Sequence, residues 1–337
     1  MKFLKIVGII LLILLVIVVI LGLMAPKKYS VERTVIINAP KDLVFNQVKY
    51  WKNWQAWSPW AENDPTMQVT IEGTDGQQGS MYKWAGDPKS TGVGEMTNTG
   101  VKENEEITYH LYFIKPWESH SEGYVRLSEV SGGTQAAWGF YGETPFPWNI
   151  FMLFMSMEKM ISKDFDRGLE LLKNICEKEY QTITSYEIKE VIFPARSFAV
   201  IEKEVGFNEM KEFYTQSYAT IMQAMKQKKM KMVGAPVGLY YTWDEQGMKS
   251  QMAAGIPIFG SLQTSEVKTV RLSMATAYTI DYYGSYEGLM YPHLALDNYL
   301  KQKGLKMKSP VIEEYITDPR AEPDTSKWLT RIYYFAE

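Results

Sequence analysis

The segment Lys226-Gln227-Lys228-Lys229-Met230-Lys231-Met232 returns about 75 residues later as Lys301-Gln302-Lys303-Gly304-Leu305-Lys306-Met307. Each copy is followed by a Pro-Val pair, which is Pro236-Val237 in the first copy and Pro310-Val311 in the second. A segment that recurs in this way indicates a duplicated structural unit. Duplicated units commonly pack about a pseudo-twofold axis, so we expect a ligand cleft where the two copies meet.

Hydrophobic periodicity around the repeated segment predicts the same order of strand, helix, strand and strand in both copies. In the first copy these elements are expected at 196–204, 208–229, 237–243 and 249–258. In the second copy they are expected at 275–283, 286–303, 311–317 and 327–335. A polar junction at 177–182 and a short strand at 186–191 precede the first copy, so we place the start of this domain near residue 183.

The composition of the 337-residue chain is that of a globular protein with more than one domain. Hydrophobic residues make up 46%, and the net charge of −3 lacks the basic excess of a nucleic-acid-binding protein. The single cysteine, Cys176, and three scattered histidines, His110, His120 and His293, form no zinc-binding pattern. We therefore expect no nucleic-acid partner, no metal and no cofactor.

Residues 6–24 form an almost unbroken apolar run, long enough to cross a bilayer core of about 30 Å. A signal peptide is the alternative to a transmembrane helix, but Pro26 after Ala25 disfavours cleavage. We expect a single-pass protein of the bacterial inner membrane, with its soluble domains on the periplasmic side. The positive-inside signal is weak because lysines flank both ends of the run. The expected organisation is an anchor at 1–26, a first domain at 27–182 and a second at 183–337.

The first soluble domain is predicted to be α+β. A strand at 30–37 leads into a helix that begins near Pro40, and alternating segments at 79–85, 92–101, 106–114, 121–129 and 134–141 predict an antiparallel meander. Apolar residues at three- and four-residue steps then predict one long helix over 148–176. Burial of that stripe is expected to place the helix against the concave face of the sheet.

Two aromatic features of this domain have competing interpretations. Trp51, Trp54, Trp57 and Trp60 recur every three residues and could form a lid over a cavity, with Trp57 and Trp60 as ligand contacts, or pack in the core. The apolar stretch 146–157 is too short to span a bilayer. We expect it to begin the long helix and line a cavity, with lipid contact as the alternative.

The motifs of the first domain resemble the polyketide cyclase/dehydrase-like branch of the SRPBCC superfamily. They are Val31-Glu32-Arg33-Thr34, Ala39-Pro40, Val44-Phe45 and Trp57-Ser58-Pro59-Trp60, followed by a glycine-rich strand region and the long helix. The resemblance covers residues 29–178 and implies a helix-grip fold, in which a curved antiparallel sheet wraps a long helix. It also implies an apolar cavity for lipids or other hydrophobic molecules, and enzymatic activity in only some members.

The second domain resembles the GyrI-like family, also called the bacterial transcription activator effector-binding domain. The matching segments are Gly255-Ile256-Pro257-Ile258, Gly284-Ser285-Tyr286, 313–319 and 327–333. The resemblance spans residues 184–335 and implies a cleft between the repeats for hydrophobic or cationic compounds. In that family a glutamate and a tyrosine two residues later point into the cleft, and Glu313 and Tyr315 match this pattern. Relatives that regulate transcription carry a helix-turn-helix domain, whereas this chain has a membrane helix and a helix-grip domain instead.

Alignment of the two copies leads to the same glutamate. Setting Pro236 on Pro310 places Leu239 opposite Glu313, so that one copy has an apolar residue where the other has an acid. Strand alternation puts Glu313 and Tyr315 on one face.

A carboxylate in an aromatic cleft suits a ligand cation. We expect Tyr241, Trp243, Tyr283 and Tyr315 to surround Glu313 and supply cation–π contacts. An exposed strand acid with structural tyrosines is the alternative, and a register error of one residue would exchange Glu313 for Glu314.

These expectations favour a membrane-anchored protein with two modules that bind or sense small hydrophobic or cationic ligands. No catalytic residue is required. The alternative is a hydrolase that detoxifies electrophilic compounds, with Glu313 orienting water and Tyr315 donating a proton. An adaptor for another membrane protein is a third reading, which rests on the anchor alone.

Overall fold

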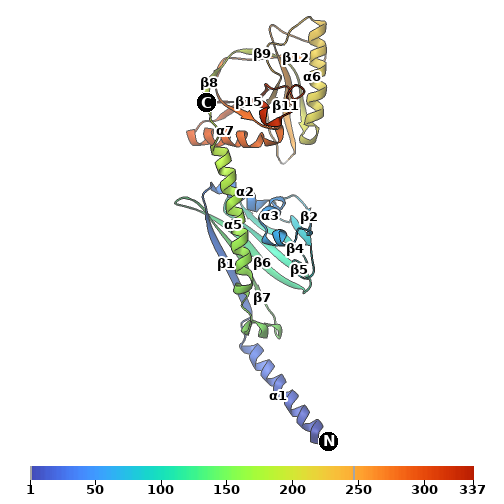
Figure 1. Ribbon diagram of the computed structural model, residues 1–337, viewed down its shortest axis with the longest axis vertical. Coiled ribbons are helices and arrows are strands. Elements are labelled where there is room, and N and C mark those ends of the chain that lie inside the picture. Colours follow the sequence, from blue (N-terminus) through green and yellow to red (C-terminus); the bar gives the residue numbers. More distant parts are fainter. Residues whose placement is uncertain (1, 246) are drawn as a thin grey trace. The chain divides into compact units, whose positions relative to one another are not determined.

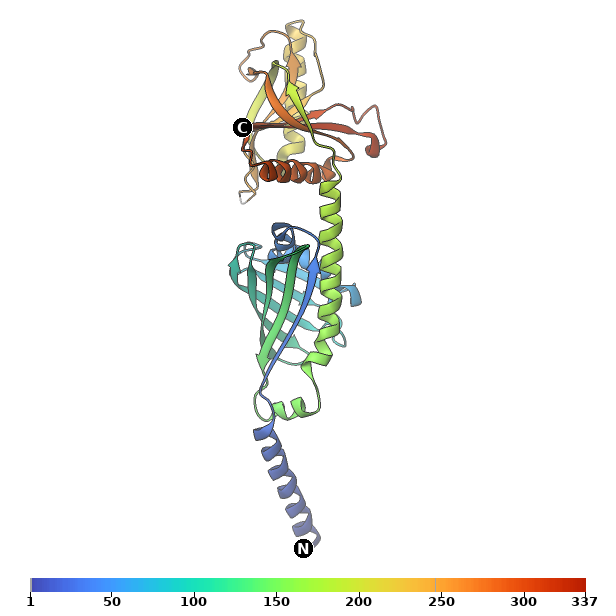
Figure 2. The same cartoon turned by 90° about the vertical axis from the view of Figure 1, so that its left-hand side faces the viewer.

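The computed structural model describes residues 2–245 and 247–337, and the chain divides into two compact units, Met1–Gln181 and Thr182–Glu337. Both units combine helices with a curled antiparallel sheet, as the sequence predicts (Figures 1 and 2). Each unit has apolar clusters of its own.

The first unit begins with an apolar helix and ends with the longest helix of the chain. Its helices are α1 (Lys2–Met24), α2 (Lys41–Lys49), α3 (Trp51–Trp57), α4 (Pro59–Asn63), the 3-10 helix η1 (Trp148–Leu153) and α5 (Met157–Thr184). Its strands are β1 (Lys28–Ile37), β2 (Gln68–Glu72), β3 (Met81–Ala85), β4 (Val93–Lys102), β5 (Glu106–Lys115), β6 (Ser119–Val130) and β7 (Gly133–Glu143). The strand order is β1-β7-β6-β5-β4-β3-β2, so the first strand closes on the last.

Aromatic rings fill the space between this sheet and α5. Trp138 of β7 stacks on Phe165 of α5 with ring centroids 4.2 Å apart, and Trp54 and Trp57 of α3 meet Trp138 edge to face. The indole N–H of Trp54 donates to the carbonyl of Val48 at 2.8 Å, so burial of this ring leaves no polar atom unpaired. The helix-grip fold predicted from the motifs is therefore confirmed, with a tightly packed aromatic interior.

The apolar stretch after β7 differs from the prediction of one continuous helix over 148–176. The chain forms the separate helix η1 at Trp148–Leu153, and α5 begins only at Met157. Pro147 occupies the N-cap position of η1, and the backbone leaves helical bonding between Phe154 and Ser156. The prediction also missed β2, α3 and α4, which are only five to seven residues long and carry little periodic signal.

The second unit contains the duplicated domain. Its strands are β8 (Lys189–Phe193), β9 (Arg196–Gly206), β10 (Val237–Tyr240), β11 (Lys249–Ile258), β12 (Lys268–Leu272), β13 (Ala275–Tyr283), β14 (Met307–Tyr315) and β15 (Leu329–Ala336). Its helices are η2 (Phe207–Glu209), α6 (Met210–Gln227), η3 (Tyr286–Gly288), α7 (Met290–Lys303) and η4 (Thr325–Lys327).

The strand order of the second sheet reveals the pseudo-twofold symmetry. The order is β12-β9-β11-β10-β14-β15-β13-β8, so β9, β11 and β10 of the first repeat mirror β13, β15 and β14 of the second. The two repeats join through the antiparallel pair β10 and β14. The expected order of strand, helix, strand and strand is thus present in both copies, and the repeats meet at the centre of the sheet.

Candidate functional site

The strand pair β10 and β14 is flanked by one helix from each repeat. Helix α6 packs on β9 and β11, and α7 packs on β13 and β15 (Figure 1). Tyr214 of α6 bonds to Tyr240 of β10, and His293 of α7 bonds to Glu313 of β14. Since Tyr240 also bonds to Glu313, both helices lie on the face of the sheet that carries this glutamate. The site therefore forms where the repeats meet.

Glu313 is the centre of a hydrogen-bonded cluster. Its side chain is buried, with the residue 6% exposed. Its Oε2 accepts hydrogen bonds from the hydroxyls of Tyr315 at 2.6 Å and Tyr240 at 3.1 Å. Its Oε1 lies 2.9 Å from Nε2 of His293. The Tyr214 hydroxyl extends the cluster by donating to the Tyr240 hydroxyl at 2.8 Å.

A glycine opposite Glu313 makes this convergence possible. Gly238 of β10 is the register partner of Glu313. A Cβ atom at this position would lie 2.2 Å from the Tyr214 hydroxyl and 2.9 Å from the Tyr315 hydroxyl. The missing side chain therefore leaves the space in which the tyrosine hydroxyls meet beside the carboxylate.

The tyrosines of the cluster are held in their neutral form. Burial raises the pKa of Tyr214, Tyr240 and Tyr315 well above the usual value near 10, and the neighbouring Glu313 charge raises it further. Desolvation likewise raises the pKa of Tyr218, which stacks on Tyr214 at 5.5 Å. Two of these neutral hydroxyls, those of Tyr240 and Tyr315, donate to Glu313, whereas the Tyr218 hydroxyl donates to the Val237 carbonyl at 3.0 Å.

His293 connects Glu313 to a second buried tyrosine. Its Nδ1 lies 3.1 Å from the hydroxyl of Tyr334. The Tyr334 hydroxyl also bonds to the Asp297 carboxyl. Because a hydroxyl has one proton, Tyr334 can donate either to Asp297 or to His293 at a given moment. His293 therefore links Glu313 to a second acid, Asp297, through Tyr334.

The adjacent glutamate has a different environment. Glu314 pairs with Arg196 at 2.8 Å and accepts a hydrogen bond from Tyr333 at 3.3 Å. It points to the opposite face of the strand from Glu313. Glu314 is thus neutralised by a permanent cation, whereas the side chains bonded to Glu313 among the described residues are His293, Tyr240 and Tyr315.

Aromatic rings border the cluster on two sides. Tyr286 meets Tyr315 edge to face at 5.5 Å and lies 5.1 Å from Trp328. Trp243 lies 5.9 Å from Tyr240 and stacks on Phe207 at 4.3 Å. Trp243, which the sequence selected, is 56% exposed and belongs to the rim of the cluster.

The structure brings Glu313 and Tyr315 together as expected, but not Tyr241 and Tyr283. Tyr241 packs against the apolar cluster on the other face of the sheet, with Leu239 and Ile312. Tyr283 is 61% exposed, while its neighbour Tyr282 is buried. The expectation for Tyr241 fails by one residue, because adjacent strand residues point to opposite faces and Tyr240 takes its place. The Tyr282 hydroxyl donates to the Ser285 carbonyl at 3.0 Å and does not replace Tyr283 in the cluster.

Three members of the cluster were not expected from the sequence. Tyr240 lies next to the selected Tyr241 and could have been found from the correct strand register. Tyr214 and His293 come from α6 and α7, and neither stands in a recognisable motif. Only the packing of those helices on the sheet brings them to Glu313.

In the first unit, the tryptophans selected as ligand contacts serve mainly as packing. Trp57 is 1% exposed and lies within the aromatic core, where its indole N–H donates to the Gln47 carbonyl at 3.3 Å. Trp60 is half-buried and meets Trp138 and Phe165 edge to face at 5.8 and 6.3 Å. The alternative of core packing therefore describes Trp57, and Trp60 lies at the border of that core.

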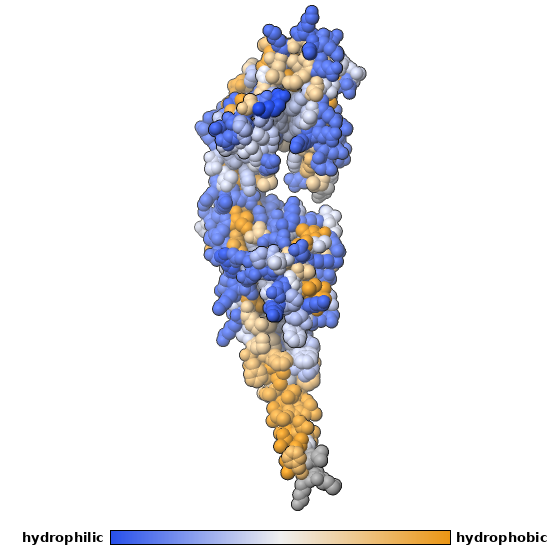
Figure 3. Space-filling view, turned by 45° about the vertical axis from the view of Figure 1, so that its right-hand side comes forward, coloured by the Kyte–Doolittle hydropathy of each residue, from blue (hydrophilic) through white to orange (hydrophobic). Residues whose placement is uncertain are grey.

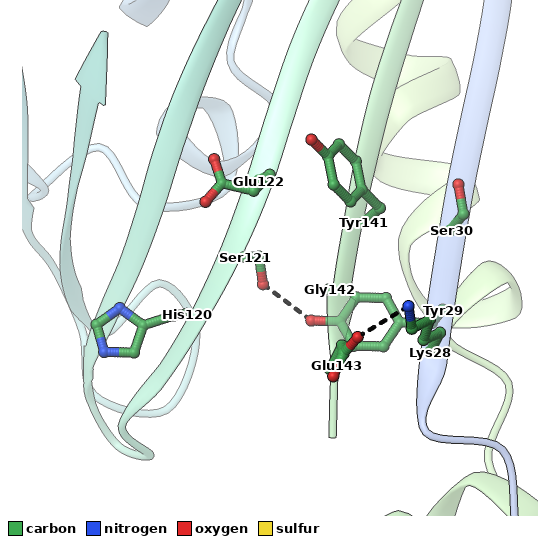
Figure 4. A pocket seen from close by; sticks show the side chains of 9 residues that line it. All are labelled: Lys28, Tyr29, Ser30, His120, Ser121, Glu122, Tyr141, Gly142 and Glu143. Carbon is green, nitrogen blue, oxygen red and sulfur yellow. Dashed lines mark hydrogen bonds and ion pairs between the residues drawn. The ribbon is translucent and has the colours of Figure 1, made fainter. Parts of the chain in front are cut away.

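Two open pockets adjoin the end of the first unit where β1 begins. One, of about 640 Å³, is lined by β1, β6 and β7, where Tyr29 bonds to Ser121 and Lys28 pairs with Glu143 (Figure 4). The other, of about 540 Å³, lies between the start of β1 and residues 152–159. They share Lys28, Tyr29 and Ser30, so both open beside the chain that leaves α1.

Two of the histidines lie together on the outer side of the first sheet. His110 Nε2 is 3.0 Å from His120 Nδ1, and His110 Nδ1 is 2.8 Å from Glu122. Within the part of the chain that the structure describes, no group of three or more His, Cys, Asp or Glu side chains is arranged to hold a metal ion.

Each unit of the chain matches a known family. Residues 28–177 match the family described as polyketide cyclase / dehydrase and lipid transport. Residues 186–334 match the GyrI-like small molecule binding domain. No curated protein matches the chain.

Solved structures resemble parts of the chain at low identity. The C-terminal domain of EcmrR is 15% identical, with 45% of this chain and 98% of that chain covered and a TM-score of 0.39. A hydrolase from Listeria innocua is 12% identical, with 48% and 98% covered and a TM-score of 0.34. Ara h 8.0201 is 13% identical, with 45% and 99% covered and a TM-score of 0.34.

The space at Gly238 can be tested by filling it. We expect Gly238→Ala to lower the free energy of unfolding by about 1 to 3 kcal/mol, because the added methyl overlaps the Tyr214 hydroxyl. The matched control is the double variant Gly238→Ala/Tyr214→Phe, which removes the overlapping oxygen and is expected to recover part of the loss. Denaturant unfolding measures both, and a Gly238→Ala variant as stable as the parent would contradict the tight packing.

Proposed function

We propose that this chain, whose two units match the polyketide cyclase / dehydrase and lipid transport family and the GyrI-like small molecule binding domain, is a membrane-anchored sensor of hydrophobic cations. In this proposal the GyrI-like unit carries the recognition site, with Glu313 as its charged centre. Tyr240, Tyr315 and the rim residue Trp243 supply aromatic contacts.

The observation that carries the proposal is a buried carboxylate to which no lysine or arginine of the described part of the chain is bonded. Glu313 is held by two neutral tyrosine hydroxyls and one imidazole. Hydrogen bonds lower the cost of burying the charge, but they leave the charge itself in place. A ligand cation would therefore gain a strong attraction in a site of low polarity.

The surrounding rings favour a cation that is large, flat and weakly hydrated. Tyrosine and tryptophan faces attract such cations through their quadrupoles. Tyr214, Tyr240 and Tyr315 are half-buried as residues although their hydroxyls are desolvated, and we propose that a ligand reaches the cluster over their exposed parts. A small, strongly hydrated ion would lose more hydration energy than these contacts return.

The apolar helix supports a membrane location. Ile6–Met24 is long and apolar enough to cross a bilayer, and 6% of the residues in its most apolar stretch are buried within the protein. We propose that α1 is an uncleaved anchor of the bacterial inner membrane and that both soluble units lie on the periplasmic side.

Hydrolysis of an electrophilic ligand is the second candidate function. It is favoured by the 2.6 Å contact between the Tyr315 hydroxyl and Glu313, which places a proton donor beside a base. The same contact also weakens this candidate, because Glu313 must release Tyr315 before it can orient a water molecule.

The binding proposal predicts a specific loss on neutralising the site. We expect Glu313→Gln to weaken binding of ethidium, a fluorescent aromatic cation, by about 1 to 3 kcal/mol, because a charge-assisted contact is lost. Affinity for the neutral aromatic pyrene should change little. Fluorescence titration of the full chain in detergent measures both.

A pair of adjacent tyrosines provides the matched control for the cluster. Tyr240→Phe is expected to weaken ethidium binding, whereas Tyr241→Phe, on the opposite face, should leave it unchanged. Equal effects of the two substitutions, or no effect of Glu313→Gln with the fold intact, would contradict a site at Glu313.

The sensing proposal also predicts that bound molecules are released unchanged. Incubation with an epoxide or an activated ester, followed by mass spectrometry, is expected to show no turnover above buffer. Turnover that disappears in both Glu313→Gln and Tyr315→Phe would instead establish the hydrolase function.

Membrane orientation is testable in cells. A C-terminal alkaline phosphatase fusion is expected to be active, because this enzyme folds only in an oxidising compartment outside the cytoplasm. An inactive phosphatase fusion, combined with a fluorescent cytoplasmic reporter at the same position, would reverse the orientation.

A further inference from the structure

The segment between β7 and α5 exposes an unusual number of large apolar side chains. Trp148 is 62% exposed, Phe151 54% and Phe154 79%. Phe146 is 45% exposed at the start of the same segment. Exposed apolar groups of this size are unfavourable in water, and a contiguous patch of them commonly marks an interaction surface.

Hydrogen bonds tie this segment to the end of the apolar helix. Asn149 is buried, and its Nδ2 donates to the carbonyls of Gly22 at 2.6 Å and Ala25 at 3.1 Å. Gly22 lies in the last turn of α1 and Ala25 directly follows the helix, where backbone carbonyls need partners outside the helix. A Cβ atom on Gly22 would lie 2.7 Å from the Phe146 ring, so glycine permits close contact here. The segment is thus held at the C-terminal end of α1.

A second exposed tryptophan lies at the same end of the sheet. Trp117, 80% exposed, stands in the turn between β5 and β6. The strand register connects this turn to the start of β1. Beside the turn, Phe113 of β5 pairs with Ser119 of β6. Ser121 of β6 pairs with Gly142 of β7, and Glu143 of β7 pairs with Lys28, where β1 begins next to α1. The β5–β6 turn and η1 therefore occupy the end of the sheet that adjoins the anchor. We call Trp117, Phe146, Trp148, Phe151 and Phe154 the anchor-end surface.

The depth of Gly22 indicates which partner this surface meets. The apolar run Ile6–Met24 has 19 residues and therefore a length of about 28 Å, close to the thickness of a bilayer core. Gly22 lies near the end of this run, so Asn149 is held near the boundary between hydrocarbon and headgroups. Tryptophan is enriched at that depth in membrane proteins, and exposed Lys27 and Lys28 follow at headgroup level.

We propose that the anchor-end surface inserts into the bilayer leaflet from which α1 emerges. This inference rests on the proposed anchoring by α1. The apolar surface of α1 continues onto the adjoining end of the first unit (Figure 3), so the same lipid phase covers both. Insertion removes the exposed rings from water and brings the pocket beside residues 152–159 to the membrane surface. A lipid-soluble molecule can then reach this pocket without crossing water.

Single-site fluorescent labelling of the full chain tests this contact. Cys176 is fully buried, and burial raises the pKa of its thiol, so an added surface cysteine is the reactive one. Phe151→Cys, Trp117→Cys and the control Ser131→Cys, in the exposed turn after β6, are labelled with an NBD fluorophore. The proteins are reconstituted in vesicles of phosphatidylcholine with phosphatidylglycerol as the minor component. Continued resistance of Cys176 to labelling confirms that each variant is folded.

We expect the emission maximum of the labels at positions 117 and 151 to shift to shorter wavelength. Lipids that carry a nitroxide on a shallow acyl carbon should quench most of this emission. The label at 131 should show neither effect. The proposal is overturned if the labels at positions 117 and 151 behave like the label at 131. It is also overturned if they are shielded without nitroxide quenching, because a second copy or another protein then covers them.

A label from Leu14→Cys in α1 separates the anchoring of α1 from the insertion of the anchor-end surface. If it escapes quenching by a deep nitroxide, anchoring fails and insertion fails with it.

Discussion

The antiparallel pairing of β10 with β14 is the constraint on which the site of the second unit depends. Leu239 and Ile312 are register partners on this pair, and both are completely buried in the apolar core below it. Because successive residues point to opposite faces, their burial forces Tyr240 and Glu313 to the face covered by α6 and α7. A slip of one residue would place a carboxylate in the apolar core at a cost of several kcal/mol. Packing on one face thus positions the chemistry on the other.

Most of the fold could be predicted because its strands are long and half-buried. The expected strands at 249–258 and 275–283 coincide with β11 and β13, where apolar residues and turn signals agree. The elements that escaped prediction, such as β2 and β12, have five residues each, and none of these residues is fully buried. The helix predicted from residue 148 failed for another reason. Apolar periodicity continues through η1, but η1 is separate from α5, and the Asn149 side chain within it bonds to the end of α1.

The site was predicted only in part because two residue pairs that can be used to align the repeats give spacings that differ by one residue. Lys226 and Lys301 are separated by 75 residues, whereas Pro236 and Pro310 are separated by 74. Alignment of the two prolines places Leu239 opposite Glu313. Alignment of the two lysines instead places Gly238 opposite Glu313 and Tyr240 opposite Tyr315. The pairing of β14 with β15 is irregular between Lys308 and Ile312, just where the two copies differ in length. A shift of one residue in the alignment there assigns every side chain of the following strand to the opposite face.

The corrected alignment explains why a symmetric scaffold can produce a selective site. Two identical repeats would present the same group twice about the axis, so two carboxylates would repel each other across β10 and β14. Glycine in one repeat and glutamate in the other yield a single charge beside open space, with Tyr240 and Tyr315 retained on both sides. Under the proposed function, selectivity arises because Glu313 repels an anion, a neutral ring gains only aromatic contacts, and a cation gains both aromatic and charge contacts. In that proposal, the asymmetry between Gly238 and Glu313 is what gives the site of a duplicated fold a preferred charge.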